Sequence, residues 1–169
     1  MFIITVNGTV AALIADAKRH AKALDRAAIS SVNKVAELAR TDGARKLAAA
    51  KHVPYSATRK RAPIRKARKG KPYATIVSLQ QGIPIDKLKA RKMKRGYSAA
   101  KQKFPHSFQM TQIIAERVER NGVRAKRLPI ERTKIELRPE AEPIYAGAVA
   151  KAHRQMDRIF QQQVKRYLG

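Results

Sequence analysis

The most constraining feature of the sequence is an apolar residue that recurs every three or four positions from residue 10 to residue 39. The series comprises Val10, Leu13, Ala17, Ala21, Leu24, Ala28, Val32, Val35 and Ala39. This spacing has the period of an α-helix, so it predicts an amphipathic helix capped by Thr9, a rod of about 45 Å. The pair Asp42-Gly43 predicts an end or a kink, with a shorter helical piece through His52.

Strand-like segments follow this helix. Residues rich in β-formers lie at Phe2 to Val6, Tyr73 to Leu79, Phe108 to Val118 and Thr133 to Leu137. The sequence "ERNG" at 119–122 is typical of a hairpin turn. The segment "YSATRKR" at 55–61 predicts a short basic helix that Pro63 ends.

The C-terminal segment predicts a second long amphipathic helix that begins near Pro139 and Pro143. Its apolar face comprises Ile144, Ala148, Ala152, Met156, Ile159, Phe160, Val164 and Leu168. Two long helices flanking a small, mainly antiparallel sheet make an α+β fold. We expect one domain over residues 1–169.

The charge of the chain indicates a polyanionic partner. Lys and Arg number 38 against 12 Asp and Glu, a formal net charge of +26, and the pI is near 11.2. Nucleic acid, an acidic protein surface or anionic lipid would match this excess. Sixteen of the cations but one acid, Asp86, fall within residues 59–103. We expect this region to be partly mobile, with 87–103 as a basic loop.

These sixteen cations are the candidates for contact with DNA or with an acidic partner. They are Arg59, Lys60, Arg61, Arg65, Lys66, Arg68, Lys69, Lys71, Lys87, Lys89, Arg91, Lys92, Lys94, Arg95, Lys101 and Lys103. Aromatic residues make up 5% of the chain, too few to favour base stacking. Any contact with nucleic acid is therefore expected at phosphate, nonspecific and dependent on salt. We expect the block from Arg59 to Lys71 to project from the edge of the sheet.

The sequence holds no arrangement typical of catalysis. Cysteine is absent, and the histidines His20, His52, His106 and His153 lie far apart. No phosphate-binding loop, nucleophile elbow or zinc-protease motif occurs. The acids from 116 to 142 are expected to pair with Arg117, Arg120, Arg132 and Arg138. We predict no enzymatic activity, no cofactor, no metal and no membrane contact, in a soluble protein made in a cytoplasm.

Read in order, the landmarks of the chain resemble the minor tail protein Z family of lambda-like bacteriophages. They are "SSVNKVAELAR" (30–40), "KHVP" (51–54), "RKRAPIRKAR" (59–68), "YATIVSL" (73–79), "GIPIDKL" (82–88), "FPHSF" (104–108), "ERVERNG" (116–122) and "RLPIE" (127–131). The order of these segments, rather than any one of them, carries the resemblance. The chain departs from the family at Pro105 to Phe108, where a Pro-Gly-Ala-Phe-like segment is usual, and in a shortened glycine-rich stretch, "GYSAAKQK".

The resemblance implies a structural tail completion protein at the head-proximal end of the tail, in a virion assembled in the host cytoplasm. It implies a cyclic ring of identical subunits, with a hexamer favoured, that helps the tail join the head and pass the genome. The implied partners are the tail terminator, tail-tube and neck or connector proteins, with phage DNA in the lumen as a further candidate. Candidates for packing between subunits are Leu13, Leu24, Val32, Val35, Ile144, Met156, Ile159 and Phe160.

Two other classes of protein share parts of this pattern. A free-standing basic nucleic-acid-binding protein of ribosomal or nucleoid type would have the same composition and basic loops. A nuclease or another phosphoryl-transfer enzyme is much less favoured, because no converging acidic residues are visible. Presence in virions at a fixed low copy number separates the tail protein from the free-standing binder.

Overall fold

The computed structural model describes residues 10–77, 82–120, 123–124 and 130–168. The predicted strand at 2–6 and its capping Thr9 lie outside these residues. The chain is a mixture of helix and antiparallel strands, as expected for an α+β fold.

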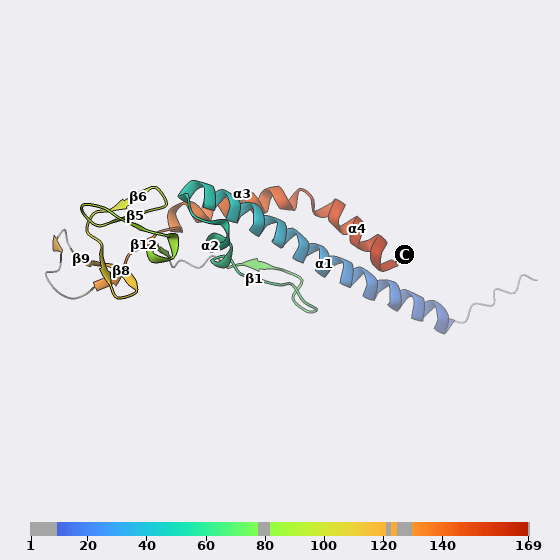
Figure 1. Cartoon of the computed structure of the whole chain (residues 1–169). Coiled ribbons are helices and arrows are strands. Elements are labelled where there is room, and N and C mark those ends of the chain that lie inside the picture. Colours follow the sequence, from blue (N-terminus) through green and yellow to red (C-terminus); the bar gives the residue numbers. More distant parts are fainter. Residues whose placement is uncertain (1–9, 78–81, 121–122, 125–129, 169) are drawn as a thin grey trace, which may run out of the picture.

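Helices form an elongated rod at one end of the molecule, and the short strands gather mainly at the other (Figure 1). The first helix, α1 (Val10–Lys51), has 42 residues and is therefore about 63 Å long. Helices α3 (Arg138–His153) and α4 (Met156–Leu168) return along it in the opposite direction. The short helix α2 (Tyr55–Lys60) follows α1 directly and packs against it.

The prediction of a helix end at Asp42-Gly43 is wrong, since α1 continues through both residues. Gly43 is buried, and a Cβ placed there would lie 2.4 Å from Cδ1 of Tyr145 in α3. The glycine therefore admits an aromatic ring against the helix backbone. Gly43, which predicts a helix end from the sequence, instead allows close packing of α3 on α1.

The buried face of α1 includes Val35 and Ala39, as predicted, but before them it is offset by about one residue from the predicted face. Ala27 and Ser31 are fully buried, whereas Leu24 is 42% exposed. The Ser31 hydroxyl donates a hydrogen bond to the Ala27 carbonyl at 2.7 Å, which satisfies it inside the rod. Alanines occur on several faces of this helix, so periodicity alone does not fix the contact face.

The C-terminal helix has two segments rather than one. Between α3 and α4 the chain tightens into a turn in which the Gln155 amide donates to the Ala152 carbonyl at 3.0 Å. Both segments still pack on α1. The Ser30 hydroxyl of α1 donates to Oε1 of Gln163 in α4 at 2.9 Å.

The strands are short and all their pairings are antiparallel. They are β1 (Ile64–Arg65), β2 (Thr75–Ile76), β3 (Ile83–Pro84), β4 (Arg91–Lys92), β5 (Tyr97–Ala99), β6 (Gln102–Phe104), β7 (Phe108–Met110), β8 (Ile113–Arg117), β9 (Glu119–Arg120), β10 (Val123–Arg124), β11 (Ile130–Arg132) and β12 (Lys134–Ile135). The sheets have the orders β1-β2, β10-β9, β11-β8-β7, β12-β3 and β4-β5-β6. A 3₁₀ turn, η1 (Ile85–Leu88), follows β3.

Several predicted segments contain turns that were not predicted from the sequence. The segment 108–118 is a hairpin, β7 and β8, that turns at Thr111, which has a positive φ of 44°. The segment 87–103, predicted as a loop, contains β4, β5 and most of β6. Its β5–β6 turn uses Ala100 and Lys101, both with positive φ, where asparagine and glycine are usual. The hairpin predicted at "ERNG" is confirmed by the pairing of β9 with β10.

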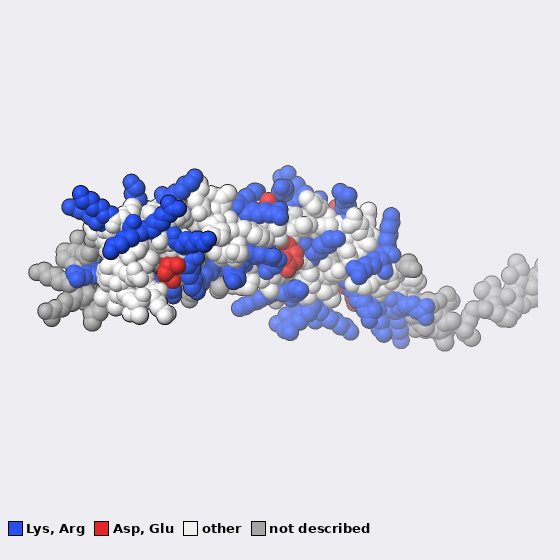
Figure 2. Space-filling model, viewed as in Figure 1, with Lys and Arg blue, Asp and Glu red and all other residues white. Residues whose placement is uncertain are grey.

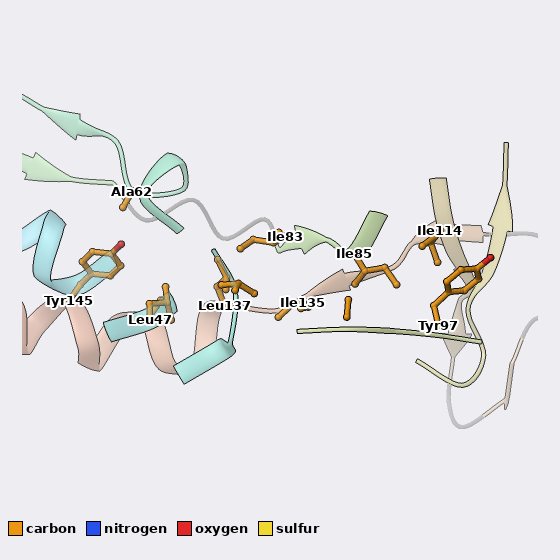
Figure 3. Packing of buried hydrophobic residues seen from close by; sticks show 12 residues of the cluster. Leu47, Ala62, Ile83, Ile85, Tyr97, Ile114, Ile135, Leu137 and Tyr145 are labelled. Carbon is orange, nitrogen blue, oxygen red and sulfur yellow. The ribbon is translucent and has the colours of Figure 1, made fainter. Parts of the chain in front are cut away.

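One cluster of buried side chains connects the rod to the strands (Figure 3). Leu47 and Tyr145 lie at the rod end of this cluster, and Ile85 and Ile135 occupy its middle. Tyr97 closes it among the strands, where its hydroxyl donates to Oε1 of Gln109 at 2.9 Å. Helices and strands therefore share a core, and the orientation of the strands follows from that of the rod.

Candidate functional site

The first block of cations lies mostly on a hairpin beside the rod, which we call the basic arm (residues 61–77). Strands β1 and β2 pair near its base, and the main chains of Arg68 and Lys71 exchange hydrogen bonds of 3.0 and 2.8 Å toward its tip. Five of its cations, Arg65, Lys66, Arg68, Lys69 and Lys71, are exposed. The arm thus carries its charge on a two-stranded projection of its own.

Asn33 of α1 attaches the basic arm to the rod. Its Oδ1 accepts a hydrogen bond from the Ala67 amide at 2.7 Å, and its Nδ2 donates to the Ala67 carbonyl at 3.1 Å. Ala67 is 5% exposed at this contact. Sequence reasoning missed Asn33, because an asparagine beside the apolar stripe of a helix reads as an ordinary surface residue.

The second block of cations lies on the three strands β4, β5 and β6, which we call the basic meander (residues 91–104). All cations of the meander and the two that precede it are exposed, namely Lys87, Lys89, Arg91, Lys92, Lys94, Arg95, Lys101 and Lys103. Gly96 is required in the meander because it has a φ of +78° and a Cβ there would lie 1.9 Å from the Phe104 carbonyl oxygen. The meander presents its cations on a folded scaffold.

Ser107, one of the departures from the family pattern, has a structural role at the end of the meander. It is 6% exposed; its hydroxyl donates to the Phe104 carbonyl at 2.7 Å and accepts from the Tyr97 amide at 3.1 Å. Among residues 105–108, all of them described, φ is nowhere positive. A glycine's conformational freedom is therefore not needed at this position.

The sixteen candidate cations do not form one patch. The basic arm lies beside the middle of the rod, whereas the basic meander lies at the end where the strands gather (Figure 1). Figure 2 shows Lys and Arg spread along the length of the visible face, with few acids between them. Arg59 of α2 lies 6.0 Å from the ring centre of Tyr55 and 3.9 Å from the Glu37 carboxylate.

The two blocks approach each other at a hollow between α2 and β3–η1, which we call the notch. Its volume is about 390 Å³, and it is lined by Pro54, Ser56, Ala57, Lys60, Arg61, Ile83, Pro84, Lys87 and Leu88. Lys60 and Lys87 are exposed, and Arg61 is half-buried. Cations about 26 positions apart in the sequence therefore line the same hollow.

The acids form their ion pairs in an arrangement that differs from the predicted one. Arg132 forms a two-bond pair with Asp86 of η1, with Nε to Oδ1 at 2.9 Å, and Glu140 accepts from Nζ of Lys51 at 2.7 Å. The hydrogen bond from Arg132 lowers the pKa of Asp86, and the bond from Lys51 lowers the pKa of Glu140. These pairs join segments that are distant in the sequence.

Three other acids lie at a separate hollow of about 420 Å³ on β8, β11 and the end of β12. Glu116 and Glu131 face each other across the strands, and they line this hollow with Glu136, Arg132, Lys134 and Arg138. Among the described residues, no group of three or more His, Cys, Asp or Glu could hold a metal ion. Nor is any described helix both long and apolar enough to cross a bilayer.

The candidates for packing between subunits divide into buried and accessible residues. Val35 and Ile159 belong to a core cluster within the chain, while Ile144, Met156, Phe160 and Val32 are half-buried. Leu24 is exposed, and the side chain of Leu13 lies outside the described part. Whether any of these contacts a second subunit stays a prediction.

An apolar groove of about 450 Å³ runs between α1, the basic arm and α3. It is lined by Val32, Val35, Ala36, Ala39, Pro72, Tyr73, Ala74, Thr75, Ile76, Tyr145, Ala146, Val149, His153 and Met156. Tyr73 is 63% exposed and Val149 is 44% exposed at its margins. The groove offers apolar surface on a chain that is otherwise strongly charged.

Comparison with known proteins gives one match that spans nearly the whole chain. Residues 8–168 match the family model for prophage minor tail protein Z (GPZ). No curated protein and no solved structure is significantly similar to the chain.

Proposed function

The chain belongs to the prophage minor tail protein Z family and is a structural protein of the phage tail; from this premise we propose that it completes the tail as a ring at the head-proximal end. The match over residues 8–168 is the observation that carries the proposal. In that role the chain acts as one domain, without catalysis, and helps the tail mature, join the head and pass the genome.

Contacts between subunits are proposed at the apolar groove. A second copy of the chain would cover Tyr73 and Val149, together with the half-buried candidates Val32 and Met156. An elongated rod suits this arrangement, because neighbouring rods around an axis can contact each other along their length. The further partners proposed are the tail terminator, the tail-tube protein, and the neck or connector proteins.

The first experiment measures the copy number of the chain in purified virions by quantitative mass spectrometry against the tail-tube protein. A fixed low ratio that fits one ring, a hexamer in the favoured case, is expected. Absence from virions would overturn the proposal and leave the free-standing nucleic-acid-binding protein as the better interpretation. Fifteen of the sixteen candidate cations are exposed, which supports nucleic-acid binding as the second candidate function.

The groove contact is tested separately with a matched pair of variants. Val149→Glu places a charge in the groove, whereas Ala150→Glu places the same charge on the neighbouring exposed residue, which does not line it. We expect Val149→Glu to abolish incorporation into particles and Ala150→Glu to permit it. Equal incorporation of both variants would exclude the groove as the contact between subunits.

A further inference from the structure

We propose that the notch between α2 and η1 binds a phosphate group of the DNA backbone, and that it is the main DNA contact of the chain. This inference rests on the proposed position of the protein where the genome passes. It goes further by assigning the contact to a few residues of a defined hollow instead of to the five exposed cations of the basic arm or to the basic meander.

The notch is strongly positive. Lys60, Arg61 and Lys87 line it, and among the described residues of its lining none is Asp or Glu. The nearest acid in the sequence, Asp86, is held by Arg132 in a two-bond ion pair, which largely cancels its charge. A concave surface with cations and low-dielectric walls concentrates the positive potential more than a convex arm does.

The side chains of the notch suit a phosphate group. Lysine donates charge-assisted hydrogen bonds to phosphate oxygens, and both lysines of the notch, Lys60 and Lys87, are exposed. Ser56 adds a hydroxyl at the same hollow. The volume of about 390 Å³ accommodates a phosphodiester with part of its sugar rather than a folded protein surface.

The notch is also lined by apolar side chains, namely those of Ala57, Ile83, Pro84 and Leu88. Ile83 and Pro84 are buried parts of β3, whose pairing with β12 fixes their positions. These apolar side chains can pack against deoxyribose while the cations hold the phosphate. None of these contacts reads a base, so binding is expected to be independent of sequence.

The test uses the purified full chain and a DNA duplex of about 30 base pairs, with affinity measured by fluorescence anisotropy over a series of salt concentrations. The notch variant is Lys60→Gln with Lys87→Gln. The matched control is Lys69→Gln with Lys92→Gln, which removes the same charge from the arm and the meander. All four lysines are exposed, so both variants are expected to fold, and circular dichroism checks this.

We expect the notch variant to bind DNA on the order of tenfold more weakly than the control variant. In the notch variant, the magnitude of the slope of log affinity against log salt concentration should fall by about one, because one phosphate contact is lost. Equal loss in the two variants would overturn the proposal in favour of diffuse charge.

Two competitors identify the ligand. Polyglutamate represents an acidic protein partner. If it displaces the DNA equally well from the wild-type chain and from the notch variant, the notch does not favour DNA and the proposal is overturned. Inorganic phosphate at millimolar concentration should compete only weakly if the backbone, rather than a free anion, is the ligand; full displacement at low concentration would assign the notch to a free anion. Copy number in virions is measured independently, so failure here leaves the proposed tail function intact.

Discussion

Gly43 is the residue on which the packing of α1 against α3 depends most directly. The ring of Tyr145 occupies the space in which any other residue would carry its Cβ. Glycine inside a helix normally lowers stability by about 1 kcal/mol relative to alanine. Here that cost is offset by the close approach of the two helices.

Replacing Gly43 by alanine should therefore destabilise the protein despite the better helix propensity of alanine. The new methyl group would lie 2.4 Å from Cδ1 of Tyr145, and such overpacking typically costs 1–3 kcal/mol. We expect the free energy of unfolding to fall by about 1–2 kcal/mol in denaturant titrations. Gly147→Ala is the control, because nothing lies within 4 Å of its Cβ, and it should raise stability by up to about 1 kcal/mol. The same sign for both variants would contradict this account.

The pair of Asp86 with Arg132 should make stability depend on pH. Arg132 lowers the pKa of Asp86, so the pair contributes fully above the ordinary Asp pKa of about 3.9 and loses its contribution as pH falls through the lowered value. Asp86→Asn should lose about 1–3 kcal/mol at neutral pH, and its difference from wild type should shrink in acid. Chemical denaturation at several pH values measures this. A similar loss in Asp25→Asn, at an exposed position of α1, would attribute the effect to net charge instead.

Asn33 provides the polar attachment of the basic arm to the rod, beside the packing of Ile76 against Val35 and Ala39. Asn33 makes both of its hydrogen bonds to the backbone of Ala67. Asn33→Ala should release the arm without unfolding the rod, since each bond contributes about 1 kcal/mol. We expect exchange of the Ala67 and Val77 amides, the latter bonded to the Pro63 carbonyl, to accelerate on the order of tenfold.

Ser30→Ala is the matched control for Asn33→Ala. It removes the hydrogen bond from α1 to Gln163 of α4, three residues earlier on the same helix. Its effect on amide exchange should be confined to α4 and the facing part of α1. If both variants accelerated exchange in the arm and in α4 alike, a general loss of rod stability would explain them.

The elements that the sequence predicts well are those with strong periodicity or marked turns. The apolar series from Val10 correctly predicts the long helix α1, and "ERNG" correctly predicts a hairpin. Pro139 correctly predicts where the C-terminal helical part begins, but not its division into α3 and α4. The turns at Thr111 and at Ala100 could not be predicted, because these residues adopt positive φ without glycine or asparagine. The helix end predicted at Gly43 was wrong because the role of this glycine depends on the ring of Tyr145, about 100 positions away in the sequence.

On the scale of the whole molecule, the sequence predicts the amount of positive charge but not its placement. All but one of the sixteen candidate cations are exposed, as expected for residues that meet a partner. Their division between the basic arm, the notch and the basic meander depends on tertiary contacts such as Asn33 with Ala67 and Asp86 with Arg132. Adjacent cations in the sequence can thus belong to different surfaces.

The basic arm provides the test of what the charge does in the assembled tail. Changing Arg65, Lys66, Arg68 and Lys69 to glutamate reverses the charge of the arm near its tip. All four side chains are exposed, so the monomer should remain folded with an unchanged circular dichroism spectrum. We expect few or no infectious particles, because the reversed arm would repel an acidic neighbouring subunit, the partner that remains for the arm if the notch is the main DNA contact.

The control is a reversal of four exposed cations on the rod, Lys18, Lys22, Arg26 and Arg158, which changes the net charge by the same amount. If the position of the arm matters, this variant should yield clearly more infectious particles than the arm variant. Normal infectivity of the arm variant would show that its charge has no part in completing the tail. Equal failure of the two would show that net charge, rather than its location on the projecting hairpin, governs assembly. The arm differs from the rod in geometry, since it carries its cations on a hairpin that Asn33 holds against α1.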